Sequence, residues 1–268
     1  MRERPSHLPN FKAPPINEVV IGVQYAQPTG YQQIRAGEVW ALYRTDYPKV
    51  EEQPPLAPAF ETFGGRSSNI LQFGIATGAT HDRFWFLSDK KDELIQFQAD
   101  RLLHNWRKVG DGTNPYPHFE SMIEKFQAEL LTLEAYFSSL ASQQLAINQA
   151  EISYVNHIAL VDTFDPGQWV RFLTFPGGHR PDDLTFAMRR MLVDPAGKPL
   201  ARLIVEANSA LTDRGQQLLV LTLTVRGAPH GTTIYDAVDF ISTGRETIVT
   251  TFAEITTESA HKKWERIQ

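Results

Sequence analysis

The residues with the clearest chemical potential lie in one loop in the second half of the chain. Residues 175–183 read FPGGHRPDD, so a glycine pair precedes His179, Arg180, Asp182 and Asp183. An imidazole titrates near neutral pH, and a nearby carboxylate can orient it as a general base. One alternative is therefore a cofactor-independent hydrolase or lyase that uses His179, with Asp182 or Asp183 as the orienting carboxylate. The other is a solvated strand connection whose charges pair with one another.

The rest of the sequence lacks the patterns of the common enzyme classes. The 268 residues include no cysteine, which excludes thiolate nucleophiles, disulfides and cysteine-ligated zinc. The histidines do not show the i, i+4 spacing of a helical zinc site, and the nucleophile elbow, the P-loop and the dinucleotide-binding glycine fingerprint are absent. We therefore expect no metal and no cofactor, and the missing motifs favour a protein that is not an enzyme without excluding the His179 alternative.

Two short segments have a chemical and a structural interpretation. Residues 64–68, GGRSS, could form an anion-binding nest of backbone N–H groups, or a flexible turn. His118 and Glu120 place a base two residues from a carboxylate. At the start of a helix the same pair serves capping and the helix dipole, which is the simpler interpretation.

Aromatic and acidic side chains supply the candidates for ligand binding. Trp40, Trp169 and Trp264 could line a cavity for an aromatic or lipid-like ligand, although core packing explains them equally well. Trp264 lies near the C-terminus, so we expect it to dock back onto the body of the protein. Glu18 is a candidate buried carboxylate that a neighbouring arginine or backbone donors would satisfy.

The charge balance argues against nucleic acid as a partner. Lys and Arg number 26 against 31 Asp and Glu, a formal charge of -5, and no basic run could follow a phosphate backbone. Arg189, Arg190, Arg202 and Arg226 fall in predicted strands, which leaves recognition of a nucleotide or nucleic acid as a third hypothesis. A solvated sheet face is the simpler explanation of these arginines.

The N-terminus and the hydropathy favour a cytoplasmic protein. Residues 1–7 lead into prolines instead of an apolar stretch, so we expect no secretory signal. No segment reaches the roughly 20 apolar residues that a membrane span requires, so we expect no membrane partner.

Periodicity and turn residues predict the order of the elements. Predicted strands cover residues 19–25, 70–75, 83–88, 94–99, 149–160, 169–175, 184–193, 201–210 and 216–226. Predicted helices cover residues 37–47, 119–137 and 232–255. Prolines and acidic residues over 48–65 predict an extended connection, and DPAG at 194–197 and TDRG at 212–215 predict two hairpins.

This order predicts an α+β fold of two antiparallel-sheet halves, each packed against a long helix. The N-terminal half would cover residues 1–161 and the C-terminal half, a meander plus a helix, residues 168–268. The turn-rich residues 162–167 form the candidate joint, and one continuous domain is the alternative. Strands followed by a helix in both halves suggest a duplication, but no residue-by-residue repeat supports it, so coincidence is an equal alternative.

The two ends of the chain carry recognisable motifs. F-x-x-P-P-I-x-E-V-V begins at Phe11, and F-x-x-I-T-x4-H-x-x-W begins at Phe252. Together with the helix around Trp40 and the linker 50–56, they resemble a sporadically distributed family of uncharacterised bacterial proteins of about this length. The resemblance covers essentially the whole chain and implies a bacterial cytosolic origin and a single module. It brings no activity and no catalytic residues, and a patchy distribution suggests a mobile or defence-associated gene cassette.

Three functional hypotheses follow from these observations. The leading one is a non-catalytic module that binds a small-molecule ligand or a protein partner from a neighbouring gene, and a homo-oligomer is compatible with it. The alternative is the hydrolase or lyase based on the His179 loop. Recognition of a nucleotide or nucleic acid through strand arginines is the third.

Overall fold

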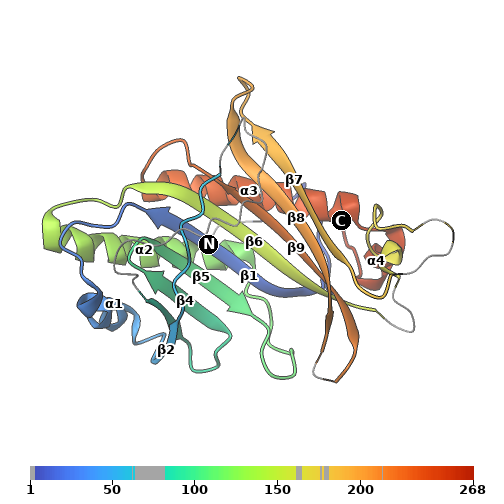
Figure 1. The fold of residues 1–268 in the computed structure, drawn as a ribbon, viewed down its shortest axis with the longest axis horizontal. Coiled ribbons are helices and arrows are strands. Elements are labelled where there is room, and N and C mark those ends of the chain that lie inside the picture. The colour runs from blue at the N-terminus through green and yellow to red at the C-terminus, as the bar shows by residue number, and fades with distance from the viewer. Residues whose placement is uncertain are drawn as a thin grey trace.

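A computed structural model describes residues 4–61, 63, 82–160, 165–175, 177, 181–212 and 214–268. Within these residues, nine strands form one antiparallel sheet in the order β2-β3-β4-β5-β1-β6-β9-β8-β7 (Figure 1). The strands are β1 (Ile16–Tyr25), β2 (Lys49–Gln53), β3 (Arg83–Leu87), β4 (Glu93–Gln98), β5 (Arg101–Arg107), β6 (Ile147–Ala159), β7 (Thr185–Val193), β8 (Pro199–Leu211) and β9 (Gln217–Gly227). The helices are α1 (Ala36–Tyr43), α2 (Phe119–Ala141), α3 (Ile234–Ile255) and α4 (Glu258–Lys263).

The predicted mixed α/β fold with an antiparallel sheet is confirmed. Strands β7, β8 and β9 and helices α2 and α3 lie where periodicity predicts them. The sheet continues across the predicted joint, because β6 pairs with β9 from Ala150–Gly227 to Ala159–Leu218. No helix of the described residues is both long enough and apolar enough to cross a membrane.

The prediction of a strand at 169–175 is wrong. Trp169 and Val170 both donate their backbone N–H to the Pro166 carbonyl, at 3.1 and 2.9 Å, so the chain closes a turn here. This turn follows a short 3-10 helix, η2 (Pro166–Gln168), and only Val170 forms an isolated bridge, with Thr256. Pro166 at the start of the helical turn fixes φ and favours the turn over a strand.

Three further differences concern boundaries and polar strands. The segment 48–65 is not wholly a connection, because β2 pairs with β3 as a charged edge strand. Strand β5 was not predicted, since its buried His104 and Asn105 interrupt the apolar pattern. Helix α1 ends at Tyr43 instead of continuing to residue 47. The predicted strand 70–75 and residues 162–164 of the joint lie outside the described residues.

The two faces of the sheet differ in what covers them. Helices α2 and α3 lie behind the sheet in the view of Figure 1. Helix α3 approaches β6 and β9 closely at Gly244, where a Cβ atom would lie 2.9 Å from Ile152 and 3.2 Å from Val225. Any side chain larger than hydrogen would therefore push this helix off the sheet.

The proline-rich segment 54–61 crosses the opposite face of the sheet. The Gln98 side-chain amide exchanges two hydrogen bonds with the Leu56 backbone, at 2.9 and 3.0 Å. Gln24 does the same with Ala59, at 2.7 and 3.0 Å. Each side-chain amide thus donates one hydrogen bond to the segment and accepts one from it, as a backbone residue does in a strand pair. The four bonds fix the segment to this face of the sheet.

A buried polar cluster joins α1 and α2 to the sheet. The Tyr47 hydroxyl donates to Glu129 Oε1 at 2.7 Å, and His104 Nδ1 lies 3.0 Å from Glu129 Oε2. The Tyr43 hydroxyl donates to the Glu129 backbone carbonyl at 2.8 Å. Burial, together with the negative charge of Glu129, raises the pKa of the Tyr47 hydroxyl, so this group stays a neutral donor. The Glu129 carboxylate thus links α2 to β5 and to the segment that follows α1.

Removal of this carboxylate tests its structural role. We expect Glu129→Ala to lower the free energy of unfolding by about 3–5 kcal/mol, because it leaves His104 and Tyr47 buried without their acceptor. Urea denaturation measures the change. Glu124→Ala, an exposed position of the same helix, should change it by less than about 0.5 kcal/mol. Equal effects of the two substitutions would show that the cluster contributes nothing.

Candidate functional site

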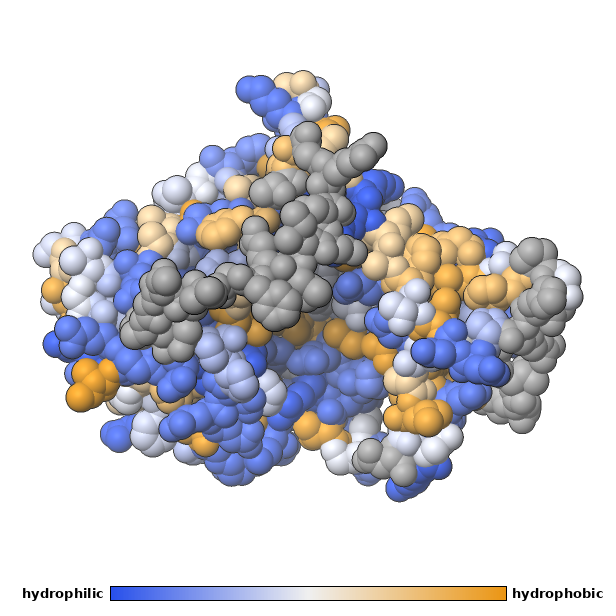
Figure 2. Space-filling model, viewed as in Figure 1, coloured by the Kyte–Doolittle hydropathy of each residue, from blue (hydrophilic) through white to orange (hydrophobic). Residues whose placement is uncertain are grey.

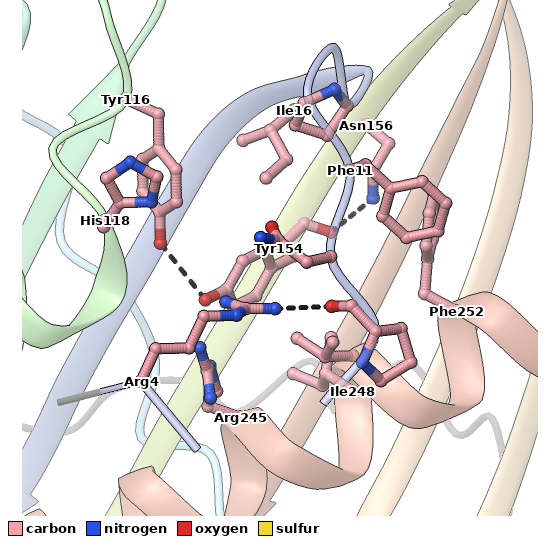
Figure 3. A pocket seen from close by; sticks show the side chains of 14 residues that line it. Arg4, Phe11, Ile16, Tyr116, His118, Tyr154, Asn156, Arg245, Ile248 and Phe252 are labelled. Carbon is pink, nitrogen blue, oxygen red and sulfur yellow. Dashed lines mark hydrogen bonds between the residues drawn. The ribbon is translucent and has the colours of Figure 1, made fainter. Parts of the chain in front are cut away.

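A cavity opens between α3, the central strands and the N-terminal segment. Its volume is about 80 Å³. It is lined by Arg4, Pro9, Asn10, Phe11, Pro14, Ile16, Tyr116, His118, Tyr154, Asn156, Arg245, Ile248, Val249 and Phe252. Figure 3 shows that these side chains come from four parts of the chain: the N-terminus, the approach to α2, strand β6 and helix α3. The cavity is the site at which these segments meet.

Two tyrosine hydroxyls form one side of the cavity. Tyr116 and Tyr154 point toward each other, and their hydroxyl oxygens lie 3.2 Å apart (Figure 3). Burial raises the pKa of both hydroxyls, that of Tyr116 well above its usual range. Both groups therefore remain protonated at physiological pH and can donate hydrogen bonds.

Arg245 projects from α3 and is almost completely buried, with 2% of its surface exposed. Its Nη2 donates to Glu120 Oε1 at 2.9 Å, and its guanidinium lies 5.3 Å from the centre of the Phe119 ring. Its Nε, in contrast, has no hydrogen-bond partner among the described residues. A buried N–H without an acceptor costs free energy, so a hydrogen bond from this group to an added acceptor would be favourable.

Arg4 adds a second positive charge to the same wall. Its guanidinium donates to the Pro9 carbonyl and lies beside Arg245 below the tyrosine pair (Figure 3). Burial lowers the pKa of Arg4, and the charge of Arg245 lowers it further, although arginine remains protonated. Among the described residues, Glu120 pairs with Arg245. The wall thus carries two positive charges and one negative charge.

His118 occupies the N-cap position of α2 without capping it. Its side chain makes no capping hydrogen bond, and its φ of 65° is in the region that favours glycine. Such a backbone costs about 1–3 kcal/mol and is found mainly where the surroundings fix a side chain in place. The ring instead lies 5.4 Å from that of Tyr116, in the cavity wall. Capping, the simpler interpretation of the sequence, is therefore wrong for His118.

The apolar wall of the cavity depends on contact between the two chain ends. Phe11 packs edge-on against Phe252, His261 and Trp264, with ring centroids 5.8, 5.5 and 6.2 Å apart. Trp264 also stacks on Trp169 at 5.8 Å. Residues of the two terminal motifs thus lie in one cluster, and the expected docking of Trp264 is observed.

Backbone hydrogen bonds reinforce this contact. The N–H groups of Lys12 and Ala13 donate to the carbonyls of Glu265 and Trp264, each at 3.1 Å. Ile267 N–H donates to the Asn10 carbonyl at 2.8 Å. The C-terminal tail therefore holds the N-terminal segment that carries Phe11 and closes the cavity.

The sequence-predicted catalytic residues do not form a site among the described residues. His179 and Arg180 lie outside those residues. Asp182 is exposed, and Asp183 accepts a hydrogen bond from the Ser209 hydroxyl and from the Leu184 backbone at 2.8 Å. Asp183 thus has a structural role at the start of β7.

The predicted ligand-binding residues occupy three separate places. Trp169 and Trp264 stack beside the cavity but do not line it. Trp40 does not line the cavity, and its Nε1 donates to the Tyr47 carbonyl at 3.0 Å. Glu18 is half-buried on the face crossed by segment 54–61 and accepts from the Asn105 amide at 2.6 Å, where an arginine or backbone donor was expected.

Two of the four strand arginines are already paired. Arg202 and Arg226 lie 2.8 and 3.6 Å from the Glu61 carboxylate, and Arg226 lies 2.7 Å from Glu151. These carboxylates neutralise the two arginines within the protein, which weakens the case for a phosphate-binding face.

Sequence reasoning missed the arginines and tyrosines that line the cavity. One signal was present, because Arg245 falls on the apolar stripe of its helix with Ile241 and Ile248. A charged residue at such a position must find a buried partner. Arg4, Tyr116 and Tyr154 give no comparable signal, since their proximity arises from folding.

Comparisons with known proteins do not add a relative. No protein-family model matches the chain, and no curated protein matches it. Among solved structures, the chain is similar to the crystal structure of the di-domain ARO/CYC StfQ from the steffimycin biosynthetic pathway. The identity is 10% and the TM-score 0.18, over 88% of this chain and 98% of that chain. A similarity at this TM-score carries no argument about this protein.

The closed wall leads to a prediction about the chain termini. We expect Trp264→Ala to lower the free energy of unfolding by about 3–5 kcal/mol, as for other buried tryptophans, and to release the tail. The amides of Lys12 and Ala13, which bond to it, should then exchange hydrogen faster. Hydrogen exchange followed by NMR measures this. Ile267→Ala, in an exposed position of the same tail, should leave exchange unchanged, and slow exchange in both variants would contradict the role of the tail.

Proposed function

We propose that this protein is a non-catalytic binding module and that the cavity beside α3 holds a small organic anion. The observation that carries the proposal is the buried Arg245, whose Nε has no acceptor among the described residues. A hydrogen bond to a charged acceptor contributes about 1.5–3 kcal/mol, more than one to a neutral acceptor.

The charges of the wall favour a ligand with one negative charge. Arg4 and Arg245 carry two positive charges, and Glu120 offsets one of them. The hydroxyls of Tyr116 and Tyr154 are neutral donors because burial raises their pKa values. Together these groups offer several hydrogen bonds to one carboxylate, and a dianion would exceed the positive charge available.

The apolar wall and the volume favour a short hydrocarbon body. Ile16, Ile248 and Phe252 supply apolar lining to the same cavity (Figure 3). The volume of about 80 Å³ is roughly half that of a 150 Å³ protein cavity that binds benzene, so it suits a molecule with few non-hydrogen atoms. A short-chain carboxylate is therefore the class of ligand that fits best.

Binding is favoured over turnover by the side chains that line the cavity. They include no serine or cysteine nucleophile. His118 is the imidazole among the lining residues, and no carboxylate lies within ion-pair distance of it among the described residues. A general base oriented by an acid is therefore lacking at this site.

We also propose that the chain arose by duplication, with residues 16–141 and 147–255 as the two repeats, so that the boundary precedes β6. The support is the order of elements, since β1 and β6 meet at the centre of the sheet and each precedes a strand meander and then a long helix. Strand β5 packs beside β1 as β9 packs beside β6. The cavity lies near the junction of the proposed repeats.

Isothermal titration with butyrate and butyramide tests the proposed ligand class. The two molecules are similar in size, and butyramide is uncharged. We expect butyrate to bind about 10–100-fold more tightly, because it alone forms charge-assisted hydrogen bonds with Arg245 and Arg4. The combined substitutions Arg245→Met and Glu120→Gln, which avoid an unpaired buried carboxylate, should abolish the preference.

Two single substitutions complete this experiment. Arg4→Met removes the half-buried charge without disturbing the ion pair of Arg245, and it should reduce the preference for butyrate. Arg44→Met removes an exposed charge at the end of α1 and should leave binding unchanged. Equal affinity of the intact protein for both molecules, or no binding of either, would contradict the proposal.

A further inference from the structure

Strand β7 forms one edge of the sheet, and it is unusual in being long and largely exposed. It is nine residues long, and β8 is its single partner among the described strands. Seven of the nine residues are exposed and two are half-buried. The N–H and C=O groups of every second residue in an edge strand point away from the sheet and can pair with another strand.

The opposite edge shows how such a strand is normally protected. Strand β2 has five residues, three of them charged, and Pro54 and Pro55 follow it directly. Short length, charge and proline all prevent the addition of a further strand. β7 contains no proline and no acidic residue, so it lacks this protection.

Apolar side chains are exposed along and beside β7. Met188, Met191 and Val193 are 38, 47 and 51% exposed. Phe172 and Phe175, which precede the strand, are 38 and 39% exposed, and the Phe172 ring lies 5.0 Å from that of Phe186. Figure 2 shows apolar surface on the β7 and α4 side of this face, beside a polar centre. Met191 and Val193 project to one face of the sheet and Met188 to the other. Exposed apolar side chains gathered along a strand edge in this way favour an interaction site.

Two arginines specify the charge of the partner. Arg189 and Arg190 are adjacent, so they project to opposite faces of the sheet. Both are exposed, and neither lies within 4.0 Å of a carboxylate among the described residues. Pairing of two copies of β7 would bring these four arginines together, and like charges across a strand pair are destabilising. An acidic strand would instead meet a positive charge on each face.

We propose that β7 is a docking site for an extended acidic segment of a partner protein, which adds as a tenth strand beside it. The backbone of the partner would pair with the free edge, as in other cases of strand addition. Its apolar residues would cover the exposed Met191 and Val193, and its carboxylates would pair with Arg189 and Arg190. This interaction is separate from the ligand cavity, whose lining residues do not include β7.

Two labelled peptides of the length of β7 test this proposal by fluorescence anisotropy with the full-length protein. In one, valine alternates with glutamate, and in the other, valine alternates with lysine. We expect the glutamate peptide to bind at least tenfold more tightly and to slow amide exchange in β7. Charge reversal by Arg189→Glu and Arg190→Glu should transfer the preference to the lysine peptide.

A matched variant at the other edge serves as the control. Lys49→Glu and Lys90→Glu reverse two exposed charges near β2 and should leave the preference for the glutamate peptide unchanged. Failure of both peptides to bind, or equal binding of the two, would overturn the proposal. Slow exchange of β7 in the dilute free protein, or exchange that slows with protein concentration alone, would also overturn it, because the edge would then be occupied by this chain itself or by a second copy.

Discussion

Arg245 is a charged side chain on the inner face of α3, and a buried guanidinium is costly unless a carboxylate pairs with it. Its partner Glu120 lies 125 residues earlier, in the first turn of α2. The ion pair therefore fixes the start of α2 against the middle of α3, over the centre of the sheet. The approach to α2 carries Tyr116 and His118 to the same place. One electrostatic requirement thus brings together most polar groups of the cavity.

The ion pair satisfies only part of the guanidinium, and the chain ends enclose the remainder. The N-terminal segment brings Arg4 and Phe11 over the cavity, while the C-terminal tail holds that segment through Trp264 and backbone hydrogen bonds. The N-terminal segment and the approach to α2 thus form the part of the wall that does not belong to the sheet or to the long helices.

Local patterns in the sequence predicted the strands and helices whose formation depends on residues close together in the chain. Alternation predicted β7 to β9, and the stripe from Ile234 to Ile255 predicted α3, whose N-terminus carries a capping box of Thr233 and Asp236. The pairing of β1 with β6 and the meeting of Tyr116 with Tyr154 depend on residues far apart in sequence, which periodicity cannot detect. Strand β5 was missed because His104 is buried through its contact with Glu129, and no neighbouring residue indicates that partner. The catalytic interpretation of the His179 loop had no second residue elsewhere in the chain to support it.

In the proposed binding mode, Arg245 Nε donates a hydrogen bond to the carboxylate of the ligand. Nitrogen-15 NMR of arginine-labelled protein observes this atom directly, and its signal is the one lost in the Arg245→Met, Glu120→Gln variant. On titration with butyrate, we expect a downfield shift of the Arg245 Nε proton and slower exchange with water, since a charge-assisted hydrogen bond forms there. An Arg245 signal that stays unchanged at saturating butyrate would contradict this binding mode.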